Sequence, residues 1–251
     1  MSTAATAVPA PEETPGAVNP FARVVGVLFN PKPTFASIIR KPDWILPIIL
    51  GSLIFIAVTA TFTYRGGWPS MFEKQDADNS RIQQMSPAAR QKLMDNQMKY
   101  APTFSYVAGA IVPLLTALIV AGILLGAFTA TGTTKTNFKT SLAITAYAGM
   151  PWIIHGLFSI LILFLKDPST VDLQNVVASN PGAFLSSDAP KWLAALLAAV
   201  DVFAVWNLIL LGVGFSATNP KKLSVGKAFV IVLALWLFYV AVKVGAIALL
   251  T

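Results

Sequence analysis

Residues 226–250 read GKAFVIVLALWLFYVAVKVGAIALL and form the last long apolar stretch of the chain. Crossing the hydrocarbon core of a bilayer, which is about 30 Å thick, takes about 20 mostly apolar residues in a helix. This stretch meets that length and carries two charged side chains, Lys227 near its start and Lys243 inside it. It therefore predicts a transmembrane helix.

Four earlier stretches have the same apolar character and spanning length. They cover about residues 44–64, 103–130, 141–165 and 191–216. Pro47, Pro113 and Pro151 lie inside three of them. A proline inside a membrane helix predicts a local kink, whose freed carbonyl groups are satisfied by neighbouring helices. Together the stretches predict an all-α bundle of five transmembrane helices.

The overall composition excludes an ordinary soluble domain. Of 251 residues, 55% are hydrophobic and 12% are charged, and the mean hydropathy is +0.68, whereas soluble domains carry about 25% charged residues. The net charge of +7 does not indicate a nucleic-acid partner, because basic residues in a membrane protein mainly set its orientation. Cysteine is absent and there is one histidine, which excludes disulfides and thiolate chemistry and argues against a metal site.

The chain before the first span divides into two parts. Residues 1–20, rich in Ala, Thr, Pro and Glu, have neither the basic nor the apolar region of a secretory signal and predict a disordered tail. Residues 21–43 alternate apolar clusters with prolines and basic residues. This pattern is typical of short amphipathic helices in the membrane interface, with Pro33 as a helix start. Residues 44–251 form the predicted five-helix domain.

Three of the connections between spans indicate the orientation of the chain. Residues 131–140 and 217–225 are short and basic and contain no acidic residue, whereas residues 166–190 hold three Asp and one Lys. The density of Lys and Arg beside the spans favours a cytoplasmic N-terminus and an exported C-terminus.

The longest connection, residues 65–102, is polar. Within it, Ser86-Pro87 has the pattern of an N-cap serine followed by a proline in the first helical position. We expect a helix from this point to about Tyr100, separate from the second span.

The ends of the second and fourth spans resemble each other. Residues 124–131 read LLGAFTAT and residues 210–218 read LLGVGFSAT, a match with one inserted residue. Lysines and then a phenylalanine follow each copy. Either the last four spans form two hairpins related as parallel repeats, or the similarity is a chance match between apolar segments.

Short motifs along the chain occur in the order found in a known family. They read NPKPTF at 30–35, PDW at 42–44 with Pro47, NFK at 137–139, YAGMP at 147–151, DVF at 201–203 with Trp206 and Gly212, and SVGKA at 224–228. With these motifs the chain resembles the Yip-domain (Ypt-interacting-protein) family, particularly its prokaryotic branch. The resemblance covers about residues 21–250.

The resemblance implies a five-helix membrane protein with a cytoplasmic N-terminus, and the prokaryotic branch implies the bacterial cytoplasmic (inner) membrane. Eukaryotic members are associated with traffic between endoplasmic reticulum and Golgi and with Rab-type GTPases. Residues 1–43 contain no counterpart of the N-terminal Asp-Leu-Tyr-Gly-Pro-like motif of those members. This difference argues against a GTPase partner.

Three ionisable residues fall inside predicted spans, namely His155, Asp201 and Lys243. A charged side chain there costs about 2.5–3.5 kcal/mol on insertion scales and needs a partner, water or the interface. Asp201 and Lys243 lie about equally far, roughly 30 Å at 1.5 Å per residue, from the loop between the last two spans, so they can pair. His155 belongs to the same layer, which Ser159 and Tyr239 extend by one helical turn.

This polar layer has two interpretations. In the first it is structural, because Asp201 fixes helix register through an ion pair or hydrogen bond, while Lys243 can also extend to the outer interface. In the second it is a proton relay or pathway in a small transporter or channel-like protein.

Glycines and lysines supply two further sets of candidates. The small faces on the helices come from Gly122, Gly126, Gly212 and Gly214. They predict close helix packing, either within the chain or across a dimer. The basic loops carry Lys135, Lys139, Lys221, Lys222 and Lys227. These lysines either contact anionic lipid head groups, at about 1 kcal/mol per residue, or only set orientation.

Motifs for enzymatic chemistry are missing from the sequence, which has no HExxH, no P-loop and no Gly-x-Ser-x-Gly. We therefore expect a non-enzymatic integral membrane protein without a cofactor, which organises the membrane or binds partners. The expected partners are membrane lipid, another membrane protein or a second copy of the chain, and not nucleic acid. The alternative is the transporter or channel-like protein that would use the Asp/Lys/His layer.

Overall fold

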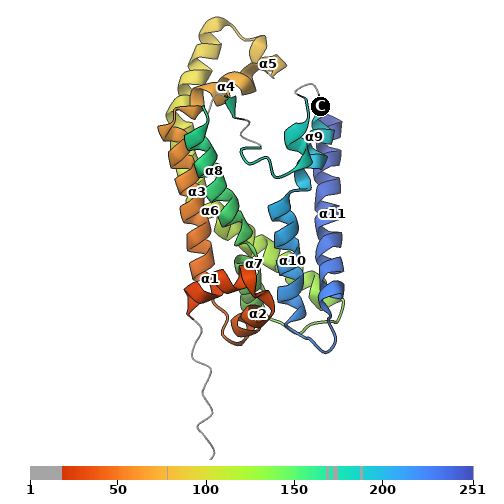
Figure 1. Ribbon diagram of the computed structural model, residues 1–251. Coiled ribbons are helices and arrows are strands. Elements are labelled where there is room, and N and C mark those ends of the chain that lie inside the picture. Colours follow the sequence, from red (N-terminus) through yellow and green to blue (C-terminus); the bar gives the residue numbers. More distant parts are fainter. Residues whose placement is uncertain (1–18, 78, 168–169, 172–174, 187–188, 251) are drawn as a thin grey trace, which may run out of the picture.

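The structure is a computed structural model that describes residues 19–77, 79–167, 170–171, 175–186 and 189–250. The predicted tail over residues 1–20 lies outside this range except for Asn19 and Pro20, which open the first helix. The described residues form helices and no strand. Figure 1 shows them as an elongated bundle, which confirms the all-α class.

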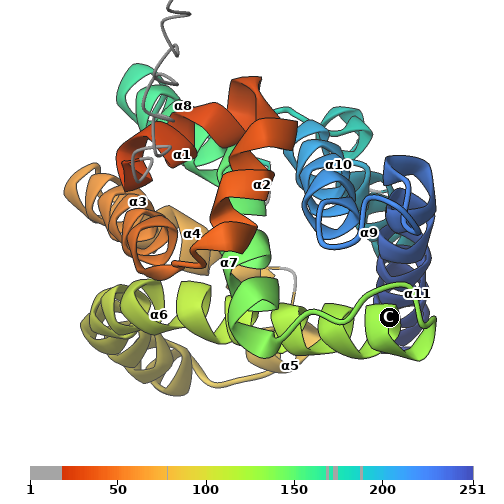
Figure 2. The same ribbon diagram turned by 90° about the horizontal axis from the view of Figure 1, so that it is seen from below.

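Two short helices lie across one end of the bundle (Figures 1 and 2). Helix α1, Pro20–Phe29, starts where the Asn19 side chain accepts a hydrogen bond from the backbone N–H of Phe21. Helix α2, Pro31–Arg40, begins two residues before the predicted Pro33. Proline is favoured in the first turn of a helix, because the N–H groups there have no partner within the helix. Both prolines therefore fit in the first turn, and the first of them sets the start.

The spanning helices follow in the predicted order. They are α3 (Ile45–Tyr64), α6 (Pro87–Ala130), α7 (Phe138–Ala148) continued by α8 (Pro151–Leu165), α9 (Lys191–Ala199) continued by α10 (Val202–Ser216), and α11 (Val225–Leu250). Four helices of the described chain are long and apolar enough to cross a membrane, and the α9–α10 pair, bent by 47°, makes a fifth if it counts as one span. The protein is thus a multi-pass integral membrane protein.

Helix α6 differs from the prediction because it is continuous over 44 residues. Ser86 does cap it, accepting a hydrogen bond from the N–H of Ala89, but the helix does not end at Tyr100. At 1.5 Å per residue it is about 66 Å long, roughly twice the thickness of a hydrocarbon core. The change from polar to apolar sequence near Tyr100 marks where the helix changes environment and does not mark a loop. Pro102 and Pro113 are accommodated inside it.

The rest of the predicted polar loop is also helical. Helix α4, Gly67–Ala77, and the short helix α5, Ser80–Gln83, lie at the end of the bundle opposite α1 and α2. We call these the α4 end and the α1–α2 end. A small apolar cluster of Phe62, Trp68, Phe72 and Leu163 packs at the α4 end. The short 3₁₀ helix η2, Pro181–Phe184, packs against α9.

The largest buried cluster lies at the α1–α2 end and centres on α7. Every residue from Thr140 to Ala148 is buried, because α1, α2, α6 and α10 all pack around this helix. Phe35 of α2 contributes a fully buried ring to the same cluster. Helices α1 and α2 are therefore an integral part of the packed core.

The two similar segments at the ends of α6 and α10 occupy matching places in this cluster. Phe128 and Phe215, which align in the two copies, stack with ring centroids 4.3 Å apart and planes within 5° of parallel. A Cβ atom added to Gly212 would lie 3.1 Å from Cα of Phe229, so α10 and α11 approach closely there. A Cβ atom added to Gly122 of α6 would lie 3.9 Å from the ring of Phe138, so the contact there is looser.

Candidate functional site

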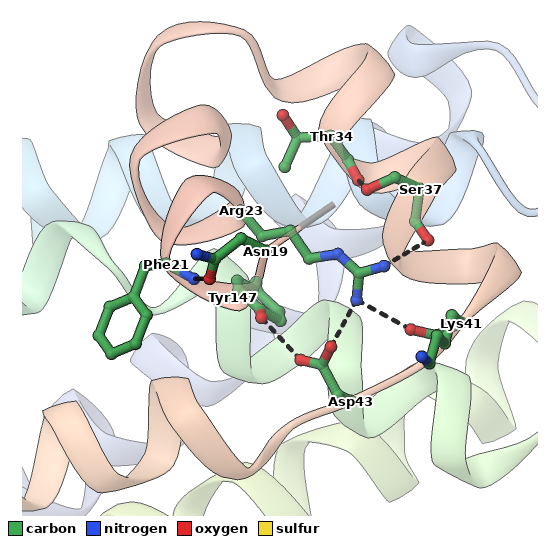
Figure 3. A network of polar contacts seen from close by, with 8 residues as sticks. All are labelled: Asn19, Phe21, Arg23, Thr34, Ser37, Lys41, Asp43 and Tyr147. Atoms are coloured by element: carbon green, nitrogen blue, oxygen red, sulfur yellow. Dashed lines mark hydrogen bonds and ion pairs between the residues drawn. The ribbon is translucent and has the colours of Figure 1, made fainter. Parts of the chain in front are cut away.

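Arg23 of α1 is the centre of a buried polar network (Figure 3). Its side chain is only 4% exposed. Nη1 donates to Oδ2 of Asp43 at 2.5 Å and to the carbonyl oxygen of Lys41 at 2.9 Å, and Nη2 donates to the carbonyl oxygen of Ser37 at 3.1 Å. One guanidinium group thus joins α1 to the end of α2 and to the segment that leads into α3.

The second oxygen of Asp43 extends the network into the bundle. The hydroxyl of Tyr147, a fully buried residue of α7, donates to Asp43 Oδ1 at 2.6 Å. Hydrogen bonds to charged groups contribute about 1.5–3 kcal/mol each. The side chain of Asp43 is 33% exposed and that of Arg23 is buried, so removing one partner leaves the other charge only partly hydrated, which adds to the cost. We call Arg23, Asp43 and Tyr147 the clamp, because they join α1 and the end of α2 to the buried helix α7.

The clamp was not predicted as a site from the sequence. Arg23 is one of the basic residues of segment 21–43, whose pattern predicts an amphipathic helix, and the structure buries it. The signal that could have found it is an arginine within the apolar pattern of an amphipathic helix, which requires a buried acid as partner. Asp43 and Tyr147 both lie in the motifs that carry the family resemblance.

The intramembrane layer is arranged differently from the prediction. Asp201 is the N-cap of α10, and its Oδ1 accepts from the N–H groups of Phe203 (2.8 Å) and Ala204 (3.2 Å). Its Oδ2 accepts from the hydroxyl of Ser179. Within the described part of the chain Asp201 forms no ion pair with Lys243, whose side chain is exposed on α11. Of the two structural roles expected for Asp201, the described residues thus show the hydrogen bonds and not the ion pair, because the break between α9 and α10 frees N–H groups that bind the carboxylate.

His155 does lie near this break. Its ring meets the ring of Phe203 edge to face at 5.2 Å between centroids, and the ring of Trp152 at 5.5 Å. The hydroxyl of Ser159 donates to the carbonyl oxygen of His155 at 2.9 Å, inside α8. Both residues line a mostly apolar cavity of about 570 Å³ between α3, α6, α7, α8 and α10. Tyr239 is exposed on α11, away from this group.

The basic loops meet at the α1–α2 end. The hydroxyls of Thr134 and Thr218 share a hydrogen bond of 2.8 Å, and the Asn219 amide nitrogen donates to the carbonyl oxygen of Thr133 at 2.9 Å. The side chains exposed there include those of Lys135, Lys139, Lys221, Lys222 and Lys227.

The remaining predicted glycines differ in their surroundings. A Cβ atom at Gly214 would lie 2.5 Å from Cγ2 of Ile144 and 3.1 Å from the ring of Phe35, so this glycine lets α10 approach both α7 and α2. Gly126 has no atom of the described chain within 4 Å of such a Cβ. Intramolecular packing therefore uses Gly214, and the surface at Gly126 is open.

Comparisons with known proteins agree with this architecture. The Yip1 domain model matches residues 25–247. Membrane protein YknW of Bacillus subtilis (strain 168) is 21% identical over 226 residues, which cover 88% of this chain and 89% of that protein. No solved structure matches the chain. Because the family match covers residues 25–247, which is well over half of the chain, the chain belongs to the Yip1-domain family of membrane proteins.

Proposed function

We propose that the protein is non-enzymatic and organises the bilayer through its interfacial helices α1 and α2. The observation that carries this proposal is an apolar stripe on α1. Phe21, Val25 and Phe29 follow one another at a spacing of four and are 63%, 58% and 77% exposed. This spacing puts them on one face of the helix, whereas Arg23 and Val27 on the other face are buried.

A helix with one apolar face and basic neighbours binds at the boundary between head groups and acyl chains. The basic neighbours here are Lys32, Arg40 and Lys41, all of them exposed on or beside α2. The clamp holds the stripe in a fixed place relative to the spanning helices. We propose that the stripe inserts into one leaflet beside the bundle and that membrane lipid is the partner it contacts.

The proposal places this end of the bundle on the cytoplasmic side of a bacterial inner membrane. Both basic loops, which join α6 to α7 and α10 to α11, lie at the same end as α1 and α2 (Figure 1). Cytoplasmic loops are enriched in Lys and Arg. A reporter fused after Thr251 tests the orientation. We expect the reporter to show that the C-terminus lies in the exported compartment. A C-terminus in the cytoplasm would contradict the proposed orientation.

Fluorescence quenching tests the contact between the stripe and the bilayer. Because the chain has no cysteine, a Val25→Cys variant carries a single thiol for a fluorophore. In reconstituted vesicles we expect quenching by lipids brominated near the head group. Quenching only by aqueous iodide would show that the stripe faces water and would contradict the proposal.

A triple variant tests whether the stripe acts on lipid or on another protein. Phe21→Ser, Val25→Ser and Phe29→Ser together remove the apolar face, and the matched control replaces the same residues with Leu. After purification from native membranes, we expect the Ser variant to retain less phospholipid than the control. If another protein co-purifies in a stoichiometric amount with the Leu control and is lost from the Ser variant, the stripe binds a protein partner. That result would contradict bilayer organisation as its function.

A further inference from the structure

A polar pocket at the α1–α2 end is not used by the proposed function. It has a volume of about 540 Å³ and lies where the loop from α6 to α7 meets the loop from α10 to α11. The polar side chains that line it include those of Thr134, Lys135, Thr136, Asn137, Asn219 and Lys222. Each loop thus contributes one lysine.

The pocket is positively charged without compensation. Neither basic loop contains an acidic residue, and the lining of the pocket contains none. Within the described ranges, Lys135 and Lys222 take part in no ion pair. Asn137 caps the N-terminus of α7 by accepting from the N–H of Thr140, so the positive end of an 11-residue helix adds to the field of the two lysines.

The walls of the pocket are held in place by hydrogen bonds between the loops. The hydroxyl of Thr134, a buried residue, is bonded to Thr218, and Asn219 is bonded to the backbone of Thr133. Ile39 of α2 contributes an apolar wall. The pocket is therefore a preorganised site for a compact, negatively charged polar group. Its apolar wall suits a ligand in which an apolar part is attached to that group.

We propose that this pocket binds the phosphate of an anionic phospholipid head group, with Lys135 and Lys222 as the two cationic ligands. The shared chemistry is a phosphate group, and a soluble phosphate has it as well. Position favours the lipid, because the lining residues lie in the two loops at the ends of four spanning helices and in the neighbouring α2. The site does not depend on the apolar stripe of α1.

Titration of the purified full-length protein with phosphatidylglycerol, followed by native mass spectrometry, tests the site. The Lys135→Gln/Lys222→Gln variant should bind the lipid about 30-fold more weakly, because each lysine contributes about a factor of five. The control Lys221→Gln/Lys227→Gln removes the same charge from lysines that do not line the pocket. It should keep an affinity close to that of the unsubstituted chain. The Lys135→Arg/Lys222→Arg variant should also keep it.

Each of the following results would overturn the assignment. Equal losses of phosphatidylglycerol affinity in the two double Gln variants would show a general effect of surface charge. Equal affinity for phosphatidylcholine would show that the site does not recognise the negative charge of the head group. Inorganic phosphate that displaces the lipid at equal concentration would assign the pocket to a soluble ligand. If the double variant does not fold, the single variants Lys135→Gln and Lys222→Gln should each weaken binding about fivefold, and no change in either would overturn the proposal.

Discussion

The clamp and the intramembrane layer each combine a basic residue, an acidic residue and a ring, but they are built in opposite ways. In the clamp, Arg23 and Asp43 form a direct ion pair that Tyr147 completes. In the layer, Asp201 is bonded to backbone N–H groups and to a serine, and Lys243 is exposed. Asp201 and Lys243, which the sequence places inside predicted spans, therefore do not pair in the described chain, whereas Arg23 and Asp43, which precede the first span, do.

The difference follows from the cost of burying each charge. An arginine has five N–H donors, and burying it requires several acceptors at once. The end of α2 and the segment after it supply these acceptors, as the carbonyl groups of Ser37 and Lys41 and the carboxylate of Asp43. A carboxylate at a helix start needs only the N–H groups that the start itself exposes. A helix break can thus hold an acid inside a membrane protein without a basic partner.

The largest effect is expected for Arg23→Met. Losing the guanidinium leaves Asp43 with Tyr147 as its remaining bonded side chain, and we expect a loss of about 3 kcal/mol in the free energy of unfolding in detergent micelles. The double variant Arg23→Met/Asp43→Leu should lose less than the sum of the two single variants. Additive losses would show that the two groups do not interact.

A smaller loss is expected for Tyr147→Phe. The substitution keeps the ring in its buried place and removes one hydrogen bond to a charged group, so we expect a loss of about 2 kcal/mol in the same unfolding measurement. In the Asp43→Leu background the same substitution should cost much less, because the acceptor is gone. An unchanged cost there would place the effect of the tyrosine outside the clamp.

Asp201 should contribute less than either clamp residue. We expect Asp201→Ala to reduce the free energy of unfolding by about 1.5 kcal/mol through loss of the N-cap. Asp201→Asn should be close to neutral, because asparagine caps a helix about as well as aspartate. A large loss for the Asn variant would show that the negative charge itself is needed and would revive an ionic role for the layer.

The smallest effect is expected for Lys243→Met. Its exposed side chain makes no ion pair in the described chain, and substitutions at such positions change stability by less than about 0.5 kcal/mol. The contrary result would be a loss of unfolding free energy as large as that of Asp201→Ala, with no further loss in the Asp201→Ala/Lys243→Met double variant. It would show that Asp201 and Lys243 do pair.

The spanning helices could be predicted from the sequence because the bilayer sets their length and apolarity. The continuity of α6 could not, since a change in polarity near Tyr100 looks the same for a helix that leaves the membrane as for one that ends. The break at Asp201 was also hidden, because the residues on both sides of it are apolar. The clamp joins residues from positions 23 to 147, and no local pattern reports contacts over such a separation.

Hydrogen exchange of α1 and α2 tests most directly whether the clamp fixes the interfacial helices to the bundle. In the unsubstituted protein in nanodiscs, we expect the amides of both helices to exchange as slowly as those of α7. In Arg23→Met, protection should fall in α1 and α2 while α11 is unchanged. Fast exchange of α1 and α2 in the unsubstituted protein, or equal protection with and without Arg23, would contradict the account.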